Sequence, residues 1–202
     1  MEVRTVLEEP NEPIKNVYFM ETGIASVVAT GTEDRRIEVG LIGREGMSGL
    51  TVVLGNHRSP HSTYTQIAGQ AQRISTAKLR KAMQKSASLR SLFLKFVQAF
   101  MVQTAHTAIA NARSKLDERL SRWILMADDR IEDHKVALTH EFLSVMLGVR
   151  RAGVTEALQI LEGQGLIRSR RGEILVLDRK GIERSAGSSY GVPEAEYRRL
   201  IG

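Results

Sequence analysis

Between residues 15 and 75, hydrophobic and polar positions alternate in short runs that are separated by turn residues. In the clearest run, residues 36–42 (RIEVGLI), Ile37, Val39 and Leu41 alternate with Arg36, Glu38 and Gly40. A period of two predicts β-strands. The expected strands span residues 15–20, 23–30, 36–42, 62–67 and 70–75. Strands of this length predict a small antiparallel sandwich or barrel. The preceding residues 1–13, which are rich in acids and contain two prolines, are expected to be an exposed lead-in.

The period changes to that of a helix after residue 87. Residues 88–113 contain no Gly or Pro, and Leu89, Phe93, Phe96 and Phe100 recur at helical spacing. A second stripe on another face comprises Leu94, Val97, Met101, Ala105 and Ala108. Two apolar stripes are more than a small β domain can cover, so we expect one to pack on that domain and the other on a second copy of the chain. Packing of the helix wholly within one chain is the alternative.

The segment 116–129 predicts a further amphipathic helix, and residues 138–167 predict a helix-turn-helix. Thr139 is a suitable N-cap for a helix over 140–147, and Gly148 supplies the turn. A second helix over about 150–164 places Val154, Leu158 and Leu161 on one face. Small Ser144, Gly148 and β-branched Val154 fit the close crossing of the two helices.

A β-hairpin with a basic tip is expected directly after these helices. Residues 166–177 hold two apolar runs around Arg168, Arg170 and Arg171. Guanidinium groups at a hairpin tip are suited to bidentate contacts with phosphate oxygens. A helix-turn-helix followed by such a wing predicts binding to double-stranded DNA.

The outer face of the second helix would enter the major groove. Ala152, Thr155 and Gln159 lie opposite its buried stripe, and Glu156 could accept a hydrogen bond from cytosine N4. Arg150 and Arg151 lie at the start of this helix, where an arginine can contact guanine or a phosphate. The sequence does not decide between these two roles for Arg151.

Composition and charge argue against several other classes of function. The chain has 202 residues, a formal charge of +6, only 5% aromatic residues and no Cys. These features argue against a stacking-based single-strand binder and exclude thiol chemistry and iron–sulfur clusters. No apolar run reaches the ~20 residues of a membrane helix and the N-terminus lacks a signal-like segment, so a cytoplasmic protein without membrane contact is expected.

The positive charge does not lie mainly in the DNA-reading segment. Residues 1–113 carry +5 and residues 114–202 only +1, and no Asp or Glu occurs between Gly46 and Leu116. Either this acid-free stretch is a solvated face, or an anionic ligand or partner lies near the β domain.

The order of these parts resembles the Crp/Fnr superfamily of bacterial transcription regulators. The resemblance implies an α+β fold with an N-terminal antiparallel, jelly-roll-like β-roll, a long dimerisation helix and a C-terminal winged helix-turn-helix. It places the β-roll (cyclic-nucleotide-binding-like, N-terminally short) in residues 1–87, the interfacial helix in 88–113, the DNA-binding domain in 114–180 and a tail of no assigned function in 181–202. Within this tail, residues 193–200 are a candidate cap of the winged domain.

The resemblance also implies partners and an effector site. It predicts a homodimer on a two-fold symmetric operator, no enzymatic activity, and RNA polymerase as a candidate partner. The family's effector cassette contains a ribose-binding Glu and a phosphate-binding Arg-Ser pair; Arg58 and Ser59 match the pair, whereas Ser48 stands at the Glu position. Without that carboxylate a ribose hydroxyl lacks its acceptor, so a cyclic nucleotide is a doubtful cofactor, and no metal is expected.

Two alternatives remain. A metalloenzyme could use His57 and His61, but no carboxylate follows Glu45 nearby. The second alternative is a dimeric ligand- or partner-binding module that has lost specific DNA readout. Glu156 on the recognition helix favours this alternative.

Overall fold

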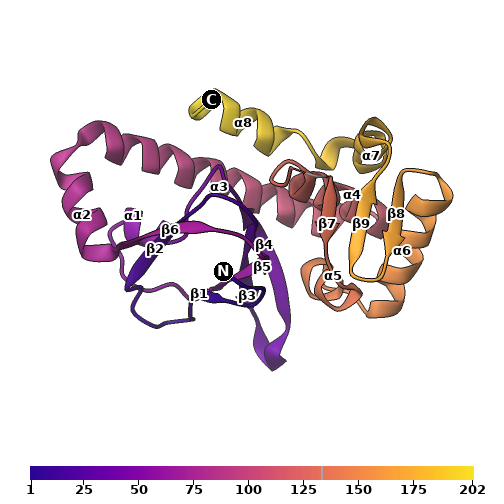
Figure 1. Ribbon diagram of the computed structural model, residues 1–202, viewed down its shortest axis with the longest axis horizontal. Coiled ribbons are helices and arrows are strands. Elements are labelled where there is room, and N and C mark those ends of the chain that lie inside the picture. Colours follow the sequence, from indigo (N-terminus) through magenta and orange to yellow (C-terminus); the bar gives the residue numbers. More distant parts are fainter. Residues whose placement is uncertain (133) are drawn as a thin grey trace.

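The computed structural model describes residues 1–132 and 134–202, and it confirms the predicted α+β fold with a β-roll, a long helix and a winged helix-turn-helix (Figure 1). The strands are β1 (Val6–Glu8), β2 (Asn16–Met20), β3 (Ile24–Thr30), β4 (Arg36–Ile42), β5 (Ser62–Ile67), β6 (Ala71–Ser75), β7 (Lys135–Ala137), β8 (Ile167–Arg170) and β9 (Glu173–Val176). The α-helices are α1 (Leu50–Val53), α2 (Thr76–Lys85), α3 (Ala87–Arg113), α4 (Leu116–Asp128), α5 (His140–Leu147), α6 (Arg151–Gly163), α7 (Arg179–Ala186) and α8 (Val192–Leu200). Short 3-10 turns occur at Thr32–Asp34 and Gly187–Ser189.

The β-roll consists of two antiparallel sheets. One has the order β1-β5-β3-β4 and the other pairs β2 with β6. The five predicted strands are confirmed as β2 to β6. Most of residues 1–13 are exposed as expected, but this segment also contains a strand. Val6 pairs with Tyr64, and the Arg4 N–H donates to the Thr65 carbonyl over 2.7 Å, so this segment forms an edge strand. Three residues are too few for an alternating pattern to reveal such a strand.

The simple alternation predicted for residues 36–42 is also wrong, because a β-bulge interrupts β4. Along the pairing with β3, Val27 lies opposite Gly40 and Val28 opposite Glu38, so Val39 is the extra residue. A bulge shifts the side-chain alternation by one residue. Glu38 and Leu41 consequently lie on the same, outer face of the sheet, and both are buried.

The inner faces of the strands pack on α3. Val17, Ile42 and Met47 form one apolar core with Phe93 and Phe96 of this helix. Two glycines allow α3 to approach the strands closely. A Cβ at Gly46 would lie 2.3 Å from the Phe96 ring, and one at Gly40 would lie 2.6 Å from the Phe100 ring. One of the two predicted stripes of α3 therefore covers the β-roll, as expected, but Val97 of the second stripe is buried in the same core.

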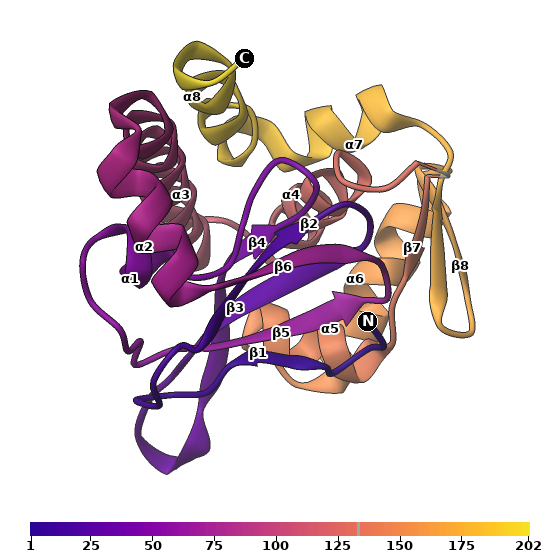
Figure 2. The same ribbon diagram turned by 60° about the vertical axis from the view of Figure 1, so that its left-hand side comes forward.

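The outer face of the four-stranded sheet packs on the C-terminal half (Figure 2). Ile24, Val28 and Leu41 belong to the same hydrophobic cluster as Ile124 of α4 and Leu143 of α5. The winged-helix half is thus docked on the β-roll through a continuous apolar contact.

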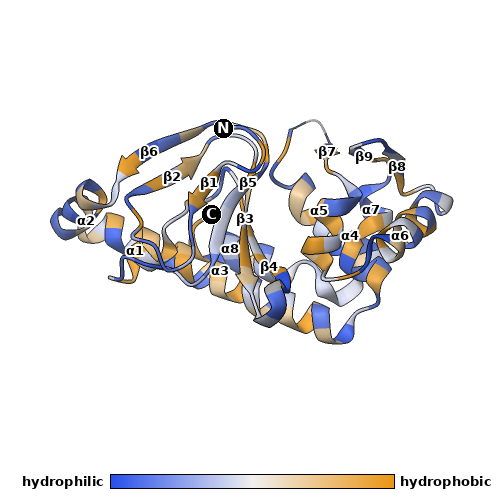
Figure 3. Cartoon of the chain, turned by 90° about the horizontal axis from the view of Figure 1, so that it is seen from below, coloured by the Kyte–Doolittle hydropathy of each residue, from blue (hydrophilic) through white to orange (hydrophobic). Residues whose placement is uncertain are grey.

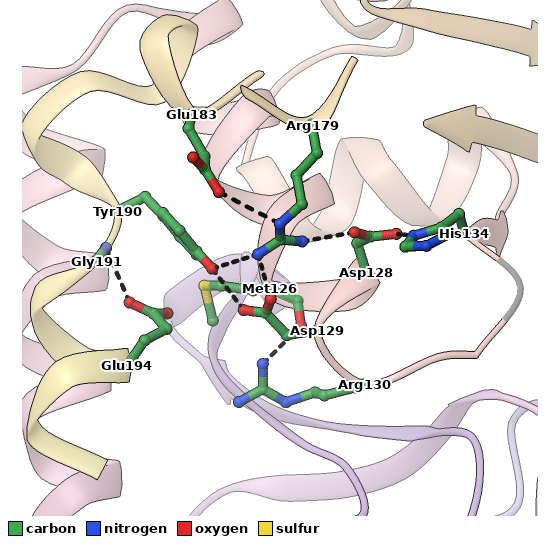
Figure 4. Close-up of polar contacts among 10 residues, drawn as sticks. All are labelled: Met126, Asp128, Asp129, Arg130, His134, Arg179, Glu183, Tyr190, Gly191 and Glu194. Atoms are coloured by element: carbon green, nitrogen blue, oxygen red, sulfur yellow. Dashed lines mark hydrogen bonds and ion pairs between the residues drawn. The ribbon is translucent and has the colours of Figure 1, made fainter. Parts of the chain in front are cut away.

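A polar network fastens α7 to the end of α4 (Figure 4). Arg179 donates to Asp128 over 2.6 Å and to Asp129 over 2.5 Å. The nitrogen that donates to Asp129 also donates to the Tyr190 hydroxyl. That hydroxyl donates to the other oxygen of Asp129 over 2.7 Å. Burial and the Asp129 carboxylate raise the pKa of Tyr190, so the phenol remains a donor.

The C-terminal segment folds back on the molecule. Helix α8 runs beside α3 (Figure 1), where Glu196 accepts from Gln98 over 3.4 Å. Tyr197 donates to the Glu45 carbonyl of the β-roll over 2.9 Å. The expectation that residues 193–200 cap the winged domain is therefore wrong; α7 packs on that domain instead.

We expect neighbouring residues of α6 to differ sharply in their contribution to stability. Leu161 is 0% exposed whereas Ile160 is 42% exposed. Leu161→Ala should lower the free energy of unfolding by about 2–5 kcal/mol because it leaves a cavity, and Ile160→Ala by less than about 1 kcal/mol. Urea titrations followed by circular dichroism measure both, and equal losses would contradict the assigned packing of α6.

Candidate DNA-binding surface

Helices α5 and α6 form the predicted helix-turn-helix. The Thr139 hydroxyl caps α5 by accepting from the Phe142 N–H over 3.3 Å, and Gly148 ends the helix in the left-handed conformation with φ 61°. Arg150 is extended and α6 starts at Arg151. The predicted bounds of both helices agree with the structure to within one residue.

Apolar side chains of α6 and the glycine of the turn pack where the two helices cross. Val154 and Leu161 are completely buried and Leu158 is nearly so, which confirms the predicted inner stripe. The absent side chain of Gly148 leaves room for Ile37 of β4, whose Cδ1 would lie 3.3 Å from a Cβ there. The turn of the helix-turn-helix therefore also contacts the β-roll.

The predicted wing is the hairpin of β8 and β9, with Gly172 at its tip at φ 78°. A third strand, β7, pairs with β9 and was not predicted. The tip is held against the start of α5, because the Leu138 N–H donates to the Gly172 carbonyl over 2.8 Å. Ser169 of β8 donates to the Glu162 carboxylate of α6 over 2.7 Å. The wing is thus fixed to both helices.

The predicted DNA-contacting arginines are all exposed on these elements. Arg150 and Arg151 start α6, and Arg168, Arg170 and Arg171 lie on the wing. Within the described part of the chain, none of the five forms an ion pair. By contrast, Arg130 pairs with Glu45 at 2.7 Å, and Arg179 is neutralised by Asp128 and Asp129. The net +1 of this half therefore understates the positive charge of its outer surface.

The candidate base-contacting residues differ in accessibility. Ala152, Glu156 and Gln159 are exposed on α6. Thr155 is half-buried, and its hydroxyl lies 3.2 Å from His140 Nδ1 of α5 and 3.2 Å from the Arg151 carbonyl. Three of the four side chains are therefore exposed on α6, while Thr155 lies at its contact with α5.

The sequence of this half matches a known family over residues 118–185, described as the Crp-like helix-turn-helix domain. Residues 118–185 form a Crp-like helix-turn-helix domain. No curated protein matches the chain by sequence. Among the described residues, no helix is long and apolar enough to cross a membrane.

Solved structures, among them two described as regulators of the Crp/Fnr or CRP family, share the fold of nearly the whole chain. FixK2 from Bradyrhizobium japonicum has a TM-score of 0.77 at 17% identity, covering 92% of this chain and 94% of its own. A Crp/Fnr-family regulator from Eubacterium rectale has a TM-score of 0.71 at 18% identity, covering 92% and 88%. A CRP-family regulator from Thermus thermophilus has a TM-score of 0.71 at 18% identity, covering 93% and 95%. The fold that the resemblance implies is thus confirmed over nearly the whole chain, and the Crp-like helix-turn-helix domain over residues 118–185.

The three candidate effector residues are engaged within the β-roll or point to solvent. The buried Ser48 hydroxyl accepts from the Tyr18 N–H over 3.0 Å, and the buried Ser59 hydroxyl accepts from the His61 N–H over 3.1 Å. Arg58 is exposed. Two of the three candidate side chains therefore already have hydrogen-bond partners within the β-roll.

Glu8, which the sequence analysis did not single out, lies at the same end of the β-roll. Its buried carboxylate accepts from the Gly49 N–H, the N-cap of α1, over 2.6 Å. Burial raises the pKa of Glu8, while the hydrogen bond from Gly49 opposes this effect. The carboxyl group of Glu8 thus already accepts the backbone N–H at the start of α1.

We therefore expect no binding of a cyclic nucleotide at this cassette. Millimolar cyclic purine nucleotide should leave the Tm of the protein unchanged, because only a ligand that binds the native state stabilises it. Differential scanning fluorimetry measures this, with duplex DNA as a ligand for comparison. A Tm that rises steadily with nucleotide concentration would contradict the expectation.

Proposed function

We propose that the chain is a homodimeric, sequence-specific transcription regulator of the Crp/Fnr type, without enzymatic activity and acting on double-stranded DNA in the cytoplasm. The observation that supports DNA binding most directly is the set of five exposed arginines on α6 and the wing of a Crp-like domain, which form no ion pair with the residues that the structure describes. Phosphate contacts from such cations supply most of the affinity of DNA-binding proteins.

The proposed base readout uses the exposed start and outer face of α6. Arg151, Glu156 and Gln159 can reach base edges in the major groove, and Ala152 offers an apolar contact there. Arg168, Arg170 and Arg171 hold the backbone from the wing. In this arrangement Thr155 has a secondary role, because its hydroxyl is already bonded to groups of α5 and α6.

The proposed dimer forms through α3. Leu94 and Met101, seven residues apart, are 38% and 65% exposed, and exposed Ala105 and Ala108 continue their line. Hydrophobic residues recur along α3 in Figure 3. The β-roll covers the phenylalanine face of α3 and α8 lies along another side, so this stripe is free to pack on a second copy as in a short coiled coil. Two recognition helices would then bind half-sites about 34 Å apart.

A contact with RNA polymerase is a further part of the proposal. The acid-free stretch places Lys78, Lys81 and Lys85 on the exposed face of α2, where no ion pair is formed within the described residues. This face lies at the end of the molecule opposite the Crp-like domain (Figure 1). An acidic surface of the transcription machinery is a partner of suitable charge.

The role of Arg151 is tested by substitution. Arg151→Ala should weaken binding to the preferred duplex by about 1–3 kcal/mol and relax specificity at one base pair if Arg151 contacts a base. Selection from a random duplex pool followed by anisotropy titration measures both effects, with Arg184→Ala on α7 as a control. If the wild-type protein enriches no sequence at low salt, the alternative of a dimeric module without DNA readout is favoured.

The dimer interface is tested separately. Met101→Glu should raise the dimer dissociation constant at least about tenfold, because the carboxylates introduced in the two copies would meet in an apolar interface. Analytical ultracentrifugation measures the constant, and Gln84→Glu on α2 is the control for an added charge. An unchanged constant would place the interface elsewhere.

A further inference from the structure

A polar cluster lies within the apolar contact between the β-roll and the winged-helix half. Ser26 of β3, Glu38 of β4 and Gln66 of β5 are all buried on the outer face of the four-stranded sheet. Trp123 of α4 and Met146 of α5 contact them from the other half. The proposed DNA and dimer contacts use none of these groups.

Glu38 links the two halves directly. One of its carboxyl oxygens, Oε2, accepts from the Ser26 hydroxyl over 2.6 Å, and the other, Oε1, accepts from the Trp123 indole N–H over 2.7 Å. A carboxyl group that belongs to the sheet therefore receives a hydrogen bond from a helix of the docked half.

The number of protons in this cluster favours a neutral Glu38. The Ser26 hydroxyl also contacts Gln66 Oε1, although its single proton can serve only one of the two neighbouring oxygens. Among the described residues, the buried Gln66 Nε2 has no hydrogen-bond partner. A protonated Glu38 would donate to Ser26, which could then donate to Gln66. If Glu38 ionises, the Ser26 hydroxyl has one proton for two neighbouring oxygens, Glu38 Oε2 and Gln66 Oε1. One of these contacts then lacks a proton unless the Gln66 amide rotates to present its NH2 group.

The surroundings of Glu38 also favour its neutral form. Burial raises the pKa of Glu38 to about 7, against the opposing hydrogen bonds from Ser26 and Trp123 and the charges of Arg122 and Arg130. Arg130 is already paired with Glu45, and burial lowers the pKa of Arg122 without removing its charge near neutrality.

The other elements packed against Glu38 carry three further ionisable groups. On β5, burial and the Glu38 carboxylate raise the pKa of Tyr64 from 10.0. Helix α5 contributes Met146, and its Glu141 is exposed at the edge of the contact, bonded to Arg4. The same helix begins with His140, whose ring contacts the Thr155 hydroxyl of α6.

We propose that docking of the winged-helix half on the β-roll is proton-linked through Glu38, which is neutral in the tightly docked state and weakens docking when it ionises. In the undocked state the carboxyl group is solvated and has its ordinary pKa near 4.5. The docked state therefore holds the proton more tightly. Docking is strongest below this ordinary value, weakens as the pH rises toward about 7, and is constant above it.

The single tryptophan makes the opening of this interface measurable, since Trp123 gives the only indole N–H signal of the chain. Its protection against hydrogen exchange, corrected for the intrinsic rate, reports the opening equilibrium. We expect this protection to fall by up to about tenfold per pH unit between about pH 5 and 6.5 and to level off above about pH 7.5. Glu38→Gln retains an acceptor for the indole and should abolish the dependence.

One further variant serves as a control. Glu141→Gln is a matched change at the exposed edge of the same contact and should keep the wild-type pH profile. A pH-independent indole in the wild type, or an unchanged profile in Glu38→Gln, would overturn the proposal.

The comparison with global unfolding separates docking from overall stability. The indole should be less protected than the slowest amides of the β2–β6 ladder, because the halves separate before the roll unfolds. Equal protection would mean that the contact opens only on global unfolding, which would also overturn the proposal. The experiment uses no DNA, so its outcome is independent of the proposed regulatory function.

Discussion

The burial of α4 on all sides is the constraint on which the rest of the structure depends. Every residue from Leu120 to Asp128 is buried, including charged Arg122 and Asp128. A helix of this kind must be enclosed by apolar surfaces and must find partners for its charges. The sheet and the helices of the Crp-like domain supply the surfaces. Arg122 bonds to Thr107 of α3 over 3.2 Å, and Arg179 of α7 reaches Asp128. Helix α4 thereby joins all parts of the chain.

The same constraint explains where the positive charge remains. Buried arginines are neutralised by nearby carboxylates or bonded to α3, since an unpaired charge in the interior would be costly. The arginines of α6 and the wing lie outside this network and have no carboxylate partner in the described structure. The surface proposed for DNA is therefore positive although the half that carries it is nearly neutral.

The sequence predicted the elements with a clear period but not the contacts between them. Strands β2 to β6, helix α3 and the helix-turn-helix follow from alternation, helical stripes and caps such as Thr139 and Gly148. Strands β1 and β7 have three residues each, which is too short for a period. The pattern also could not show that both faces of β4 are buried. Its bulge at Val39 moves Glu38 to the face of Leu41, a change that no simple alternation contains.

Retaining an acid at this interface carries a physical cost. An apolar side chain of similar volume at position 38 would avoid the desolvation of a carboxyl group, although it would leave the Trp123 indole without its acceptor. A dimer that reads two half-sites needs a fixed distance between its two α6 helices, and this distance depends on how the Crp-like domain sits relative to α3. The apolar contact gives that placement its strength. The carboxyl group at its centre makes the same placement responsive to a single proton, which a wholly apolar interface could not do.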